Sequence, residues 1–75
     1  MNPEHFKISI SSPPDRDCLV AEIFMDNNQW AEVNQESGEL MLELYPRKDG
    51  QPWVFDFETA LEVLQAAKKK LIGKE

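Results

Sequence analysis

The chain has 75 residues, of which eight are Lys or Arg and fourteen are Asp or Glu, so its formal net charge is −6 at pH 7. A chain of this length forms one small domain with a thin core, which argues against a deep, enclosed active site. Its single cysteine excludes an intramolecular disulfide framework and a cysteine-based zinc cluster. The acidic balance disfavours binding to nucleic acid, which depends on clustered Lys and Arg side chains.

The first 45 residues predict four strands joined by short connections. Apolar and polar residues alternate over 6–10, which is typical of a half-buried strand. Pro13 and Pro14 end this strand, because proline removes the backbone donors of a sheet. Turn signals then separate three further apolar segments, which predict strands at about 18–25, 29–35 and 39–45.

The last third of the chain predicts one amphipathic helix. Asp56 is the expected N-cap residue and Gly73 the expected C′ residue. One face collects the residues at helical spacing: Phe57, Ala60, Leu61, Leu64, Ala67, Lys68, Leu71 and Ile72. The predicted fold is α+β, a four-stranded antiparallel β-meander with one C-terminal α-helix packed on one face (β-β-β-β-α, two layers). Residues 1–75 are expected to form one domain, with 1–5 and 74–75 frayed.

The two predicted turns, at 26–28 and at Ser37-Gly38, determine how the last three strands pair. The inner face is then apolar and is the expected seat of the helix: Ala21, Ile23, Ala31, Val33, Leu40, Leu42 and Leu44. The other face carries a row of carboxylates and a row of aromatic rings: Glu22, Glu32 and Glu43, then Phe24, Trp30 and Tyr45. Phe24 is expected to pair with Trp30, and Lys7 is expected beside Glu22.

One helix covers only one face of a sheet, so the two rows are expected to meet water or a partner. Trp and Tyr anchors beside fixed charges are typical of protein interfaces. We therefore expect Glu22, Phe24, Trp30, Glu32, Glu43 and Tyr45 to bind a basic protein partner. The alternative is that the glutamates are solvated and that the aromatic pairs only stabilise the sheet.

No group of residues predicts catalysis, a cofactor or a metal site. His5 is the only histidine and is expected at the surface. Cys18 is expected to pack as a small hydrophobic residue, because no basic group nearby would stabilise its thiolate. The three glutamates offer oxygen ligands for a hard cation, but a flat sheet seldom wraps an ion. The expected protein is therefore not an enzyme. No apolar run approaches the roughly 18–20 residues that cross a bilayer and no signal peptide is evident, so a cytoplasmic location without membrane contact is expected.

Several segments resemble small bacterial proteins, some uncharacterised and some regarded as immunity proteins of polymorphic-toxin systems. These segments are 19–23 (LVAEI), 30–33 (WAEV), 38–40 (GEL), 43–46 (ELYP) and 67–73 (AKKKLIG). The resemblance covers about residues 18–73 and implies a small α+β fold that inhibits a cognate toxin by binding it. It supplies no catalytic residues.

Three functions remain open. The first is an immunity-type inhibitor that neutralises a basic toxin through the acidic and aromatic face. The second is a structural or regulatory protein that self-associates through the same aromatic residues. The protein is expected to be a monomer or a homodimer, and an exposed edge strand would allow a β-bridged dimer. The third and least favoured is a hydrolase, which would need a pocket at an edge or between subunits.

Overall fold

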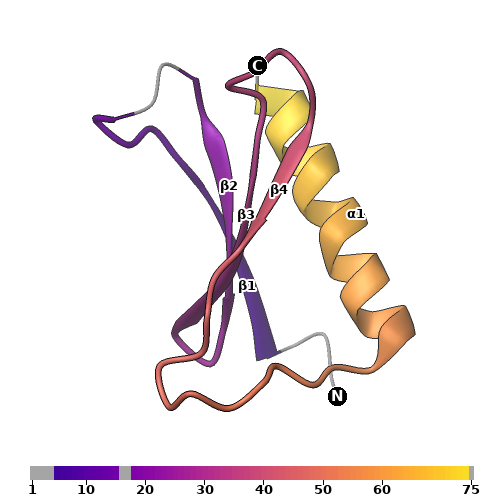
Figure 1. Cartoon of the computed structure of the whole chain (residues 1–75). Coiled ribbons are helices and arrows are strands. Elements are labelled where there is room, and N and C mark those ends of the chain that lie inside the picture. The colour runs from indigo at the N-terminus through magenta and orange to yellow at the C-terminus, as the bar shows by residue number, and fades with distance from the viewer. Residues whose placement is uncertain (1–4, 16–17, 75) are drawn as a thin grey trace.

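The computed structural model describes residues 5–15 and 18–74. It contains four strands and one helix: β1 (Phe6–Ser11), β2 (Val20–Met25), β3 (Asn28–Asn34), β4 (Met41–Leu44) and α1 (Phe57–Lys74). The strands form one antiparallel sheet in the order β1-β2-β3-β4, and α1 lies on one face of it (Figure 1). The predicted α+β meander with a C-terminal helix is confirmed. Of the ends expected to fray, residues 1–4 and 75 lie outside the described residues.

The turn between β2 and β3 is tighter than the sequence predicts. Asp26 and Asn27 have φ angles of 48° and 71°, as the two central residues of a type I′ hairpin do, and Met25 pairs with Asn28 across the turn. Asn and Asp tolerate this left-handed conformation better than most residues. The loop therefore holds two residues instead of three, and β3 begins one residue early.

A bulge in β3 absorbs the extra residue. Ile23 pairs with Ala31 but its neighbour Phe24 pairs with Gln29, which leaves Trp30 without a partner of its own on β2. The predicted pairing of Phe24 with Trp30 is therefore wrong. Because a bulge changes the direction in which side chains leave the strand, Trp30 departs from the face that strict alternation would assign to it.

Trp30 lies in the core and not on the open face of the sheet. Its side chain is only 7% exposed. Its ring centre lies 4.7 Å from that of Phe55 and 5.8 Å from that of Phe6, and the rings of Phe6 and Phe55 are 5.2 Å apart in an edge-to-face arrangement. The bulge thus converts a predicted surface anchor into the buried member of an aromatic cluster whose other rings are half-buried.

The remaining strand pairing agrees with the pairing predicted from the sequence, except at β1. Glu32 pairs with Glu43 as predicted, and the Ser37-Gly38 turn keeps this register although the ladder itself stops at Asn34 and Met41. Across β1 and β2, Ser9 stands opposite Glu22 and Lys7 stands opposite Phe24, so the predicted position of Lys7 is wrong. The long 12–19 connection gives no turn geometry from which this register could be inferred.

Asp56 caps α1 as predicted. Its Oδ2 accepts hydrogen bonds from the Thr59 backbone N–H at 3.0 Å and from the Thr59 hydroxyl at 3.1 Å. These two donors favour the carboxylate form and lower the pKa of Asp56 below its ordinary value. At the other end the helix continues through Gly73 to Lys74, so the prediction of Gly73 as a C′ residue is wrong.

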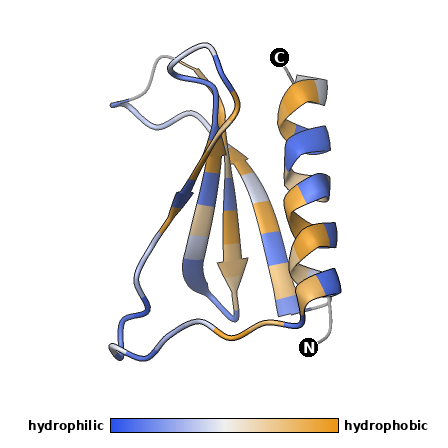
Figure 2. Ribbon diagram, turned by 45° about the vertical axis from the view of Figure 1, so that its right-hand side comes forward, coloured by the Kyte–Doolittle hydropathy of each residue, from blue (hydrophilic) through white to orange (hydrophobic). Residues whose placement is uncertain are grey.

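The helix buries a narrower stripe than its sequence predicts. Val63, Ala67 and Leu71 recur every four residues and are buried against the sheet, where α1 lies mainly over β2 and also touches β1 and β3. Phe57 and Ile72, which were expected on this face, are exposed. Bands of apolar and polar residues alternate along the strands beneath (Figure 2). The core consists of Ala21, Ile23, Trp30, Ala31, Val33, Val63, Ala67 and Leu71.

The helix does not cover β4. Leu40, Leu42 and Leu44 were expected beneath it, but they are 40%, 45% and 63% exposed. An α-helix with its side chains is about 10–12 Å wide, so it covers two or three strands. Four strands spaced by about 4.8 Å span about 14 Å. A single helix seated on β2 therefore leaves the apolar side of the fourth strand open.

Candidate functional site

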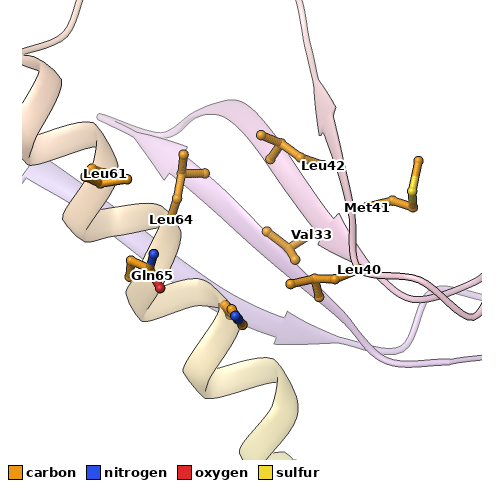
Figure 3. Close-up of a pocket in the computed structure, with 8 residues that line it drawn as sticks. Val33, Leu40, Met41, Leu42, Leu61, Leu64 and Gln65 are labelled. Atoms are coloured by element: carbon orange, nitrogen blue, oxygen red, sulfur yellow. The ribbon is translucent and has the colours of Figure 1, made fainter.

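An apolar groove runs between β4 and α1, and we call it the β4–α1 groove. It encloses a volume of about 250 Å³ and is lined by Val33, Leu40, Met41, Leu42, Leu61, Leu64, Gln65 and Lys68. Figure 3 shows Leu42 and Val33 on the sheet and Leu64 on the helix pointing into the space between the two elements, whereas Met41 points away. The surface of the groove is mostly hydrocarbon, with Gln65 and Lys68 as its polar lining residues.

The helical wall of the groove is a second stripe on α1. Leu61, Leu64, Gln65 and Lys68 follow the spacing i, i+3, i+4, i+7, which places them in one line along the helix. This line lies beside the buried stripe of Val63, Ala67 and Leu71. The wide apolar face predicted from the sequence therefore splits in two, and only one part is buried in the core.

The other wall is β4, which forms an edge of the sheet. In an antiparallel pair, residues that exchange backbone hydrogen bonds alternate with residues that do not. The Tyr45 N–H donates to the Trp30 carbonyl at 2.8 Å, so Glu43 and Met41 also belong to the hydrogen-bonded set. The backbone polar groups of Leu42 and Leu44 consequently point away from β3, toward an edge where no described strand pairs with them.

The opposite face of the sheet carries the predicted carboxylate row. Glu22 pairs with Glu32 and Glu32 with Glu43, so the register of this row is confirmed. Glu32 at its centre is only 4% exposed. Its Oε2 accepts a hydrogen bond from the Asn34 side-chain amide at 3.2 Å, and its Oε1 lies 3.3 Å from the Tyr45 hydroxyl.

Tyr45 bridges two members of the row. Its hydroxyl lies 3.3 Å from Glu32 Oε1 and 3.3 Å from Glu43 Oε2, and its single proton can be donated to one of them at a time. Partial burial, together with the negative charges of Glu32 and Glu43, raises the pKa of Tyr45 to about 12. The phenol is therefore neutral at pH 7 and acts as a donor between two carboxylates.

The six residues predicted to form one binding face do not share one. Glu22, Phe24, Glu43 and Tyr45 are half-buried, whereas Glu32 is buried within the hydrogen-bonded row and Trp30 lies in the core. The predicted aromatic row is therefore broken at its middle residue. What remains on the outer face is a carboxylate row whose centre is occupied by its own hydrogen bonds.

The other candidate groups stay separate from one another. His5 is exposed and lies 3.2 Å from Asp26 through Nδ1 and Oδ1. Cys18 is exposed, with its backbone N–H donating to Glu36 Oε1 at 3.2 Å, so the prediction that it packs as a small hydrophobic residue is wrong. Among residues 5–15 and 18–74, no three His, Cys, Asp or Glu side chains are grouped so that they could hold a metal ion. No helix in this same range is both long enough and apolar enough to cross a membrane.

The β4–α1 groove was not predicted, although the sequence contains a signal for it. The predicted inner face of the sheet carries three leucines at its β4 edge, Leu40, Leu42 and Leu44. They come in addition to the residues that one helix can bury. Counting strands against the width of a helix would have predicted an apolar surplus. The three leucines were instead predicted to lie beneath the helix, in the core.

Comparison with known proteins found no family model, no curated protein and no solved structure that matches the chain. The resemblance to immunity-type proteins therefore stays a prediction, and function is argued from the geometry of the site.

Proposed function

We propose that the protein is a non-enzymatic protein-binding module whose partner adds an extended segment to β4 above the β4–α1 groove. One observation carries this proposal. Leu42 and Leu44 turn their backbone polar groups toward the open edge of the sheet, and their side chains form an exposed apolar wall beside α1. An added strand would hydrogen-bond to the outward backbone groups of β4 and would cover the exposed leucine side chains with its own alternate side chains.

The energetics favour occupation of this edge. Exposed apolar surface gains about 25 cal/mol for each Å² that a partner removes from water. Leu40, Leu42 and Leu61 of the groove are 40–45% exposed, and Leu44 at the end of β4 is 63% exposed. Contiguous apolar surface rimmed by polar groups marks interaction sites on small proteins. The unpaired backbone groups of an edge strand also favour strand addition, since they form a template for pairing with another chain.

We further propose that the partner is basic. The net charge of −6 would attract a cationic protein and raise its association rate at low salt. Inhibition of a basic toxin in the cytoplasm, the role implied by the resemblance to immunity proteins, is the specific form of this proposal. Self-association through β4 is the alternative. It is disfavoured because each copy carries the same net charge.

The test is capture of a partner by three folded proteins: the wild type, Leu44→Pro and Leu44→Val. Proline removes the outward N–H of residue 44, and the edge tolerates it because this N–H does not bond to β3. Valine keeps the N–H and a β-forming apolar side chain. Circular dichroism and urea unfolding would establish that both variants fold like the wild type.

The expected result is that the wild type and Leu44→Val retain the same basic protein and that Leu44→Pro loses it. In the complex, amide hydrogen exchange at Leu42 and Leu44 should slow. Retention of the same protein by Leu44→Pro, or unchanged exchange at both amides, would contradict strand addition.

A further inference from the structure

A strand added to β4 would place its side chains on two different surfaces. Side chains alternate across a sheet, so partner residues opposite Leu42 and Leu44 would face the β4–α1 groove. The partner residue opposite Glu43 would face the outer side, next to the carboxylate row. The two sides of the same added segment therefore meet different chemistry.

On the outer side, a cation is favoured at the partner position opposite Glu43. Glu22, Glu32 and Glu43 lie side by side on three neighbouring strands, and the next place in this row belongs to the added strand. A like charge directly across a strand pair is destabilising, whereas an opposite charge stabilises the pair. Tyr45 does not change this preference, since its raised pKa keeps it neutral.

The groove side favours apolar residues and disfavours a cation. Its lining is mainly leucine, and Lys68 is the one charged residue that contributes to it. A basic side chain opposite Leu42 would meet hydrocarbon and lie on the same side of the sheet as Lys68. A basic side chain opposite Glu43 would instead lie on the outer side, away from Lys68.

We infer that the segment recognised by β4 alternates apolar and basic residues, with the apolar side chains in the β4–α1 groove and a Lys or Arg beside Glu43. This inference rests on the proposed function, because it specifies the chemistry of the strand that the proposed function adds. It assigns Glu43 a role in selecting the partner and assigns Leu42 and Leu44 the role of binding it.

The test uses three capped, fluorescent heptapeptides in which valine alternates with lysine, with glutamine or with glutamate. Binding to the wild type is followed by fluorescence anisotropy at low salt and at high salt. The lysine peptide is expected to bind about two- to fivefold more tightly than the glutamine peptide, and the glutamate peptide more weakly still. The preference should shrink at high salt, which screens exposed charges.

Two charge variants identify the carboxylate that causes the preference for the lysine peptide. Glu43→Gln removes the carboxylate beside the added strand, and Glu58→Gln removes one from the exposed first turn of α1, so the net charge changes equally. Glu43→Gln is expected to abolish most of the preference for lysine over glutamine, and Glu58→Gln is expected to leave it. An equal loss in both variants would mean attraction by net charge alone and would overturn the inference.

The failure of this inference differs from the failure of strand addition. If the three peptides bind the wild type equally and Leu44→Pro abolishes binding of all three, strand addition stands and the apolar–basic pattern is wrong. If no peptide binds, or if Leu44→Pro binds each peptide as the wild type does, strand addition itself is wrong. A concentration-dependent mass that Leu44→Pro abolishes would identify a second copy as the occupant and would overturn the inference as well.

Discussion

The inner strand β2 and the edge strand β4 carry similar sequences but have different surroundings. Ile23 on β2 and Leu44 on β4 both point toward the helical layer, yet Ile23 is fully buried and Leu44 is 63% exposed. In each strand one glutamate stands between apolar residues, Glu22 on β2 and Glu43 on β4, so their patterns do not distinguish them. The difference arises from the width of one helix relative to four strands, which leaves the fourth strand beside α1 and not beneath it.

The largest effect is expected at Trp30, where the bulge redirects a side chain into the core. Trp30→Ala should lower the free energy of unfolding by about 3–5 kcal/mol, because it removes the ring that contacts both Phe6 and Phe55. Urea unfolding would measure the loss. A change below about 1 kcal/mol would mean that Trp30 lies on the open face, as strict strand alternation predicts.

Substitution of two leucines on α1 compares how much the buried stripe and the groove contribute to stability. Leu71→Ala should cost about 2–5 kcal/mol of unfolding free energy, since Leu71 is fully buried. Leu61→Ala should cost less than about 1 kcal/mol, because Leu61 lines the groove and is 43% exposed. Equal costs, measured by urea unfolding, would show that the helix covers the groove in solution.

A smaller effect is expected at the centre of the outer face. Glu32→Ala removes the carboxylate that accepts from the side chains of Asn34 and Tyr45, and Asn34 is itself buried. Leaving the Asn34 amide without this acceptor should cost about 1–3 kcal/mol, whereas the Tyr45 hydroxyl can still donate to Glu43. Glu58→Ala, at an exposed position on α1, should stay within about 0.5 kcal/mol. Equal and negligible losses would mean that Glu32 is simply solvated.

The smallest effect at neutral pH concerns Tyr45, the only tyrosine in the chain. Its ultraviolet absorbance should titrate with a midpoint near pH 12, because the folded protein raises the pKa from 10.0 to about 12. The unfolded chain loses this proton first, so stability should be constant below pH 10 with respect to Tyr45 and should fall as pH rises from 10 toward 12. In Glu32→Gln the midpoint should move back toward 10. An ordinary midpoint in the wild type would contradict the bridge between Glu32 and Glu43.

Much of the fold could be predicted because it depends on local rules. Alternation predicts the strands, Asp56 predicts the start of α1, and the Ser37-Gly38 turn predicts the pairing of Glu32 with Glu43. These features depend on residues that are close in sequence or joined by a short turn.

The binding surface depends on geometry that no local pattern contains. The choice between a two-residue and a three-residue turn at 26–28 decides whether Trp30 lies outside or inside, and Asp and Asn allow both. The position of α1 over β2 decides whether Leu42 and Leu44 are core or surface. This position results from packing between distant elements. The six residues predicted as a site were consequently chosen on the face opposite the groove.

The most direct test of the open edge is amide hydrogen exchange of the free protein, resolved by residue with NMR. Glu43 and Tyr45 should exchange slowly because their N–H groups face β3, whereas Leu42 and Leu44 should exchange close to the rate of unstructured amides. Protection of Leu42 and Leu44 equal to that of Glu43 would mean that the edge is already paired or covered, and it would contradict the proposed binding surface.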